Sequence, residues 1–186
     1  MGSITIKLRF ILAILIAGIV LSSGALAASK LLIKDIDVKV GGKSDKGLKD
    51  CNTIDRDAEP GDAIEIKVKL ENNFTASEDF DIEDIAVTTT IEGIDDGDDL
   101  DDESSDFTLK QGKTKTVTFN FKVPIIVDED SYNIVIEAEG DDENGSNQDA
   151  SATIELNLDK NNDDLLLETA SVSPSTVKCQ KSISVN

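Results

Sequence analysis

The stretch "AIEIKVKLEN" at residues 63–72 decides the fold class, because apolar and polar side chains alternate at every step along it. Successive side chains of a β-strand point to opposite faces of its sheet. The stretch therefore predicts an antiparallel strand with one buried face and one solvated face. The residues expected on the buried face are Ile64, Ile66, Val68 and Leu70.

The same alternation recurs in six further stretches, at 33–40, 85–93, 106–109, 115–123, 131–140 and 152–158. Turn-forming residues separate them, including Pro60-Gly61 before the first stretch and Asn144-Gly145 at the tip of an expected hairpin. No convincing amphipathic helix interrupts the series. The pattern predicts an all-β fold, an Ig-like antiparallel β-sandwich of about seven strands over residues 30–160.

Tyr132 is the sole tyrosine, and it follows the acidic turn "DED" at 128–130 to open the penultimate expected strand. This placement is typical of a tyrosine corner, in which the hydroxyl bonds to backbone a few residues upstream. We interpret Tyr132 as a structural residue of the core.

The first 27 residues have the three-part organisation of a secretory signal peptide. Lys7 and Arg9 precede an apolar run at 10–21, and Ala25 and Ala27 supply the small residues that a signal peptidase reads. We expect a signal helix over 1–27, cleavage after Ala27, and a secreted or cell-surface protein with no membrane contact beyond this segment. An uncleaved anchor is the alternative.

Residues 165–172, "LLLETASV", repeat the pattern of residues 31–38, "LLIKDIDV". The repeat predicts that 165–186 is the incomplete start of a second Ig-like domain, joined by a polar linker at 161–164. The chain would then be a fragment of a longer array. A natural stop with a frayed tail is the alternative.

The composition excludes several functions. Asp and Glu number 38 against 18 Lys and Arg, for a net charge of −20, which disfavours nucleic acid and anionic lipid as partners. The chain has no histidine, so the commonest general base and transition-metal ligand are missing. We therefore expect no enzymatic activity.

One acidic segment at 95–106 could hold calcium, since calcium favours several oxygen ligands from such loops. Its spacing does not fit an EF-hand, and a mobile solvated loop without an ion is the alternative. The candidate ligands are Asp95, Asp96, Asp98, Asp99, Asp101 and Asp102. No other cofactor is expected.

Two sequons, at Asn73 and Asn144, are candidate glycosylation sites in an extracellular chain. The two cysteines, Cys51 and Cys179, could form a disulfide, although we place Cys51 in a loop at one pole of the sandwich. Pairing of either cysteine with another chain or with a further segment remains open.

Three stretches carry a family resemblance: "EPGDAIEIKVKLENNF" (59–74), "TLKQGKTKTVTFNFKVP" (108–124) and "SVSPSTVKC" (171–179). Together with the signal, they resemble the Ig-like modules of archaeal cell-surface, S-layer-type proteins, and are similar to bacterial cell-adhesion modules. The resemblance implies a non-catalytic structural or adhesive role in a cell envelope, with neighbouring domains or copies as partners. The alternative is an extracellular module that binds calcium or a glycan.

Overall fold

The computed structural model describes residues 28–160 and two short strands, β10 (Val172–Ser173) and β11 (Ser184–Val185), which pair with each other. The expected signal peptide and linker, and the rest of the expected second domain, lie outside the described residues. None of the described residues forms a helix long and apolar enough to cross a membrane.

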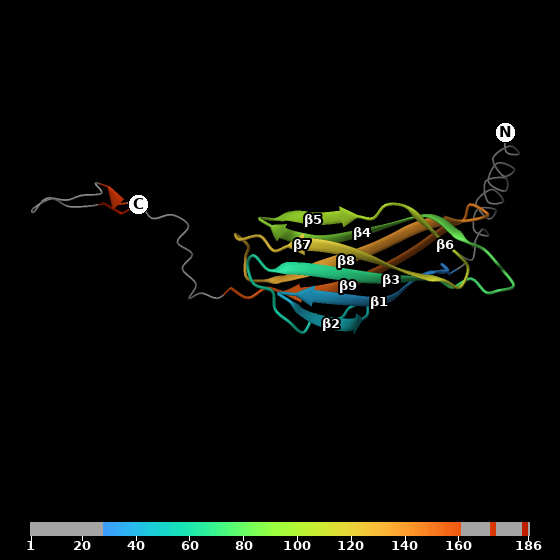
Figure 1. The fold of residues 1–186 in the computed structure, drawn as a ribbon, viewed down its shortest axis with the longest axis horizontal. Coiled ribbons are helices and arrows are strands. Elements are labelled where there is room, and N and C mark those ends of the chain that lie inside the picture. Colours follow the sequence, from blue (N-terminus) through green and yellow to red (C-terminus); the bar gives the residue numbers. More distant parts are fainter. Residues whose placement is uncertain (1–27, 161–171, 174–183, 186) are drawn as a thin grey trace, which may run out of the picture.

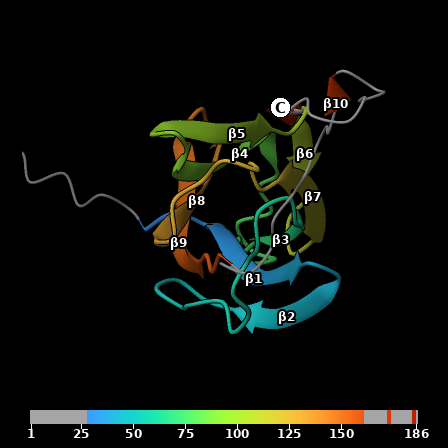
Figure 2. The same cartoon turned by 90° about the vertical axis from the view of Figure 1, so that its left-hand side faces the viewer.

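Residues 31–157 form two antiparallel sheets packed face to face (Figures 1 and 2). The first sheet has the order β2 (Lys43–Leu48), β1 (Leu31–Val40), β3 (Ala63–Asn72) and β7 (Thr114–Lys122). The second has the order β5 (Asp98–Glu103), β4 (Ile82–Asp95), β8 (Ser131–Asp142) and β9 (Asn147–Asn157), and β6 (Phe107–Leu109) also pairs with β4.

The core lies between the sheets and consists of the apolar side chains that the alternation predicted. Ile64, Ile66, Val68 and Leu70 of β3 are at most 1 % exposed, and Phe119 of β7 is among the largest fully buried side chains. Burial of this apolar surface is the main favourable contribution to folding. The all-β class and all seven expected strands are confirmed.

Two strands were not predicted, so the expected number of about seven is too low: the described part of the sandwich has nine. The additional strands, β2 ("KSDKGL") and β5 ("DDLDDE"), are almost entirely polar. Each lies at the edge of its sheet, where a strand can leave most of its side chains in solvent. An edge strand of this kind therefore shows no alternation.

The segment at 49–62 covers the free edge of β9. The amides of Cys51, Ile54 and Ala58 donate to the carbonyls of Thr153, Glu155 and Asn157, at 2.7, 2.9 and 2.8 Å. Ile54 and Ala58 also fill the core, at 1 % and 0 % exposed. The β2–β3 connection thus covers the outer edge of β9.

The chain enters the sandwich at one pole and leaves it at the opposite pole (Figure 1). At the N-terminal pole Leu31 pairs with Asn72, and Lys30 contacts Gln148. At the C-terminal pole the amide of Asp159 donates to the carbonyl of Ala58 at 2.9 Å. The sandwich thus spans the distance between the two points where the chain enters and leaves.

Candidate functional site

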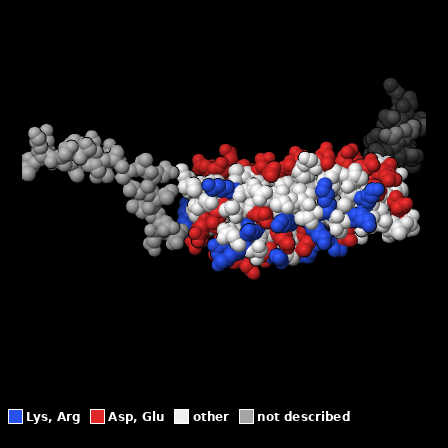
Figure 3. Space-filling model, in the orientation of Figure 1, with Lys and Arg blue, Asp and Glu red and all other residues white. Residues whose placement is uncertain are grey.

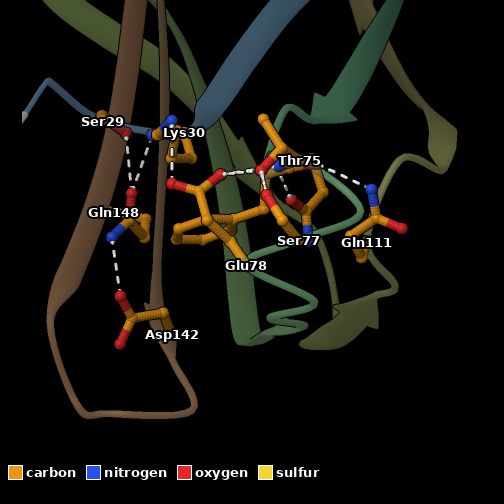
Figure 4. Close-up of polar contacts among 10 residues, drawn as sticks. Ser29, Lys30, Thr75, Ser77, Glu78, Gln111, Asp142 and Gln148 are labelled. Carbon is orange, nitrogen blue, oxygen red and sulfur yellow. Dashed lines mark hydrogen bonds and ion pairs between the residues drawn. The ribbon is translucent and has the colours of Figure 1, made fainter.

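A network of hydrogen bonds at the N-terminal pole holds the start of β1 (Figure 4). The side-chain oxygen of Gln148 accepts the backbone N–H of Lys30 at 2.8 Å, and Ser29 Oγ lies 3.5 Å from the same oxygen. Gln148 belongs to β9, so this contact joins the first described residues to the last strand of the second sheet. The chain therefore enters the sandwich at a fixed position.

The same glutamine is tied to the β8–β9 hairpin. Its side-chain nitrogen donates to Asp142 Oδ2 at 3.1 Å, while Asp142 Oδ1 accepts the amides of Asn144 and Ser146 at 2.9 and 3.0 Å. Gly145 has φ +73°, which a glycine adopts without steric cost. The expected Asn144-Gly145 turn is confirmed, and it is rigidly connected to residue 30.

A second set of contacts links Lys30 to the turn after β3. Glu78 Oε1 lies 3.3 Å from Lys30 Nζ, and Glu78 Oε2 accepts the amide and hydroxyl of Thr75 at 2.7 and 2.8 Å. The hydrogen bonds from Thr75, with a smaller contribution from Lys30, hold the pKa of the Glu78 carboxyl below its ordinary value. The ordered turn therefore favours the charged form of the Glu78 carboxyl group.

Asn72 is fully buried at the end of β3 and connects three segments. Its side-chain nitrogen donates to the carbonyls of Phe80 and Leu109 at 3.0 and 2.9 Å, and its side-chain oxygen accepts the amide of Phe74 at 3.0 Å. A buried amide with all of these partners stabilises one arrangement of the loops around it.

Sequence reasoning missed Asn72 and Gln148, although a signal was present. Asn72 lies an even number of positions from Ile64 and Leu70, and Gln148 lies an even number of positions from Ile154, so each is expected on the same face as those buried residues. A polar side chain at the inward position of an alternating strand must find hydrogen-bond partners, because an unsatisfied buried polar group is costly. Polar residues at inward positions, here Asn72 and Gln148, therefore indicate the hydrogen-bond network at this pole.

Both sequons lie at this pole, with Asn73 and Asn144 exposed. Asn73 follows β3 and its amide donates to the carbonyl of Lys30 at 2.8 Å, whereas Asn144 is at the hairpin tip. The hydroxyl of Thr75, the third sequon residue, is held by Glu78 and Ser77. The positions suit surface glycans, and glycosylation stays a prediction.

The acidic segment at 95–106 is not the loop that the sequence suggested. Residues 98–103 form β5, because Leu100 packs against the core and pairs with Ile91 of β4. Strand geometry sends successive carboxylates to opposite faces. Across residues 28–160, no group of three or more His, Cys, Asp or Glu side chains is placed to hold a metal ion. Calcium binding stays a prediction.

The six candidate ligands are thus spread along a hairpin. Asp95 ends β4 and pairs with Asp98, and Asp96 has φ +54° in the turn between them. Asp99 Oδ1 accepts the amide of Gly93 at 2.7 Å, and Asp102 Oδ1 accepts the amide of Glu103 at 3.0 Å. Asp101 pairs with Thr90 across the strands.

Cys51 is exposed and lies beside Thr153, in the middle of β9, rather than in a loop at the pole. The expected position is wrong because the chain turns back along β9 after β2. The Asp50 carboxylate accepts a hydrogen bond from the thiol and repels the thiolate, which raises the pKa of Cys51. Cys179 lies outside the described residues, so the disulfide stays a prediction.

Tyr132 forms the expected corner, and its hydroxyl donates to the carbonyl of Asp128 at 2.8 Å. Burial, with the nearby carboxylates of Asp128 and Asp130, raises the pKa of the phenol. The strand order, with β1, β3 and β7 facing β4, β8 and β9, and this corner define an Ig-like β-sandwich module.

Several solved structures are similar to the chain, and they include the following three. The C-terminal domain of wzt has 12 % identity and a TM-score of 0.48, over 71 % of this chain and 75 % of that chain. The ASH/PapD-like domain 7 of human CEP192 has 15 % identity and a TM-score of 0.40, over 66 % and 85 %. A family 123 glycoside hydrolase from Clostridium perfringens has 14 % identity and a TM-score of 0.40, over 65 % and 27 %.

No family model matches the chain, and no curated protein matches its sequence.

Proposed function

We propose that the protein is a non-catalytic structural or adhesive module of a cell envelope, similar in role to S-layer-type surface proteins. The observation that carries the proposal is the placement of the chain at opposite poles: Lys30 is fixed at one pole and Asp159 at the other. A module that is entered at one end and left at the other can act as a spacer between neighbours in a linear array.

The inferred location rests on the sequence. The signal-like residues 1–27, the acidic surface and the two exposed sequons favour an extracellular module. The absence of histidine from the whole chain favours a role that depends on packing and surface contacts rather than on proton transfer.

Expression of the full chain in a secreting host tests this proposal. We expect the protein in the medium or envelope fraction with Ala28 as its first residue, as measured by fractionation and N-terminal mass spectrometry. Replacing Ala25 and Ala27 by Leu should retain residues 1–27, while replacing Ala28 by Leu should not. Recovery of the intact wild-type chain from the cytosol with residue 1 in place would contradict the proposal.

A calcium-binding module is the second candidate, favoured by the density of carboxylates at 95–106. Calorimetric titration of the full chain with calcium should then release heat that is lost in a variant with Asp98, Asp99, Asp101 and Asp102 all changed to Asn. The matched control changes four acids elsewhere, Glu137, Glu139, Asp141 and Asp149, to their amides. No heat and no thermal shift at millimolar calcium would eliminate this candidate.

A further inference from the structure

The two long sides of the sandwich differ. On one side, the segment at 49–62 covers the edge of β9 with backbone hydrogen bonds, and the outer edge of β2 has no second strand beside it among the described residues. On the other side, β7 pairs with β3 and β5 pairs with β4, and among the described strands neither has a second neighbour along its outer edge. In Figure 2, β5 runs along the top of the molecule and β7 lies at the right, with β6 between them. Such edges present free backbone N–H and C=O groups for pairing with another chain.

The two open edges carry opposite charge. Residues 92–106, which include β5, contain nine acids and no Lys or Arg. Residues 107–127, which include β7, contain four lysines and no acid, in a chain with 38 acids. The four lysines are Lys110, Lys113, Lys115 and Lys122. Figure 3 shows acidic surface along the upper margin of the molecule, where β5 lies in Figure 1.

These charges remain available at the surface. Within residues 28–160, none of the four lysines forms an ion pair, and Lys115 instead lies over the ring of Phe107 at 3.6 Å. The five acids of β5 are all exposed. The neutralised charges lie elsewhere, for example where Lys67 meets Glu65 at 2.9 Å on β3.

We propose that the open side is an interface between two copies of this chain, in which β5 of one copy pairs with β7 of the other. Like charges directly opposite one another destabilise paired strands, so the charges disfavour β5 against β5 and β7 against β7. Opposite charges favour pairing of β5 of one copy with β7 of the other copy. A two-fold axis makes this contact twice, with β7 of the first copy also against β5 of the second.

The proposal deepens the proposed structural role, on which its biological meaning rests, by naming the surface through which copies meet. Its test is made in solution and is independent of where the protein resides. Two variants of the full chain reverse one edge each. The β7 variant carries Glu in place of all four lysines, Lys110, Lys113, Lys115 and Lys122, and the β5 variant carries Lys in place of the five acids of β5, Asp98, Asp99, Asp101, Asp102 and Glu103.

Sedimentation velocity from micromolar to millimolar protein is expected to show a dimer for the wild type. Each variant alone should be monomeric, with a dissociation constant raised at least about tenfold, because its two edges now carry the same charge. An equimolar mixture of the two variants should form a heterodimer, because β5 and β7 then carry opposite charges at both of its β5–β7 contacts. This recovery also shows that both variants are folded.

The control, Lys43→Glu with Lys46→Glu, replaces both lysines of β2 by acids, and β2 is an edge of the first sheet on the other side of the sandwich. It should keep the wild-type dimer. A wild-type chain that is monomeric throughout, variants that remain dimeric alone, or a mixture that gives no heterodimer would each overturn the edge pairing. None of these results would by itself contradict the envelope role, which is decided by the fractionation experiment.

Discussion

Tyr132 and Asp128 are joined by a hydrogen bond of 2.8 Å, in which the phenolic hydroxyl at the start of β8 donates to the backbone carbonyl oxygen of Asp128. The bond lies where the chain crosses from β7 in one sheet to β8 in the other. It fixes the conformation of an acidic turn that has no apolar anchor among residues 128–130. The hydrogen bond therefore gives Tyr132 a structural role at this corner.

Replacing Tyr132 by Phe should lower the free energy of unfolding by about 1 kcal/mol, because the ring keeps its packing and only the hydrogen bond is lost. Replacing it by Ala should cost roughly 3–5 kcal/mol, the usual range for removal of a buried aromatic ring. Urea denaturation followed by circular dichroism measures both values. If Phe were as costly as Ala, the hydroxyl would have a role beyond this single bond.

The ionisation of Tyr132 should occur above pH 10, since burial and the carboxylates of Asp128 and Asp130 disfavour the phenolate. A raised folded-state pKa contributes stability that is complete below the unfolded pKa and is lost as the pH rises through the folded value. Because the chain has one tyrosine, absorbance at 295 nm reports this group alone. A midpoint at or below that of a free tyrosine would contradict the buried, hydrogen-bonded environment.

Replacing Gln148 by Leu should destabilise the N-terminal pole by about 1–3 kcal/mol, because the amide of Lys30 and the carboxylate of Asp142 each lose a partner. Hydrogen exchange at the Lys30 amide should become faster than in the wild type. The control Asn147→Leu changes an exposed neighbour on the same strand. Equal exchange rates at Lys30 in both variants would show that Gln148 does not hold the chain there.

Replacing Asp50 by Asn should increase the rate at which Cys51 reacts with iodoacetamide, because the carboxylate raises the pKa of the thiol and so lowers the thiolate fraction. Asn keeps an oxygen that can accept the amide of Thr153. Every protein in the comparison also carries Cys179→Ser, so that Cys51 is its single thiol. Asp55→Asn is the matched control, and an unchanged rate in Asp50→Asn would contradict the assigned cause.

Much of the fold could be predicted because alternation is a local property of the chain. A strand such as β3 buries one face, and its sequence has to supply apolar residues at every second position. The corner at Tyr132 and the turn at Asn144-Gly145 are equally local, since each depends on a few neighbouring residues. Such features can be read without knowing which strands pair.

The edge strands and the polar network could not be predicted in the same way. β2 and β5 are strands only because β1 and β4 offer them a partner, and their own residues resemble a solvated loop. The contact between Gln148 and Lys30 joins residues 118 positions apart. Its existence depends on how the two sheets close on each other.

The sequence by itself determined that this protein is built from two-faced strands around an aliphatic core, because period-two burial is encoded residue by residue. Only the tertiary structure decided which strands lie at the edges and that the acid-rich β5 and the lysine-bearing β7 both lie at sheet edges on one side of the described sandwich. The physical reason is that sheet order arises from long-range closure and pairing, which no single stretch of the chain specifies.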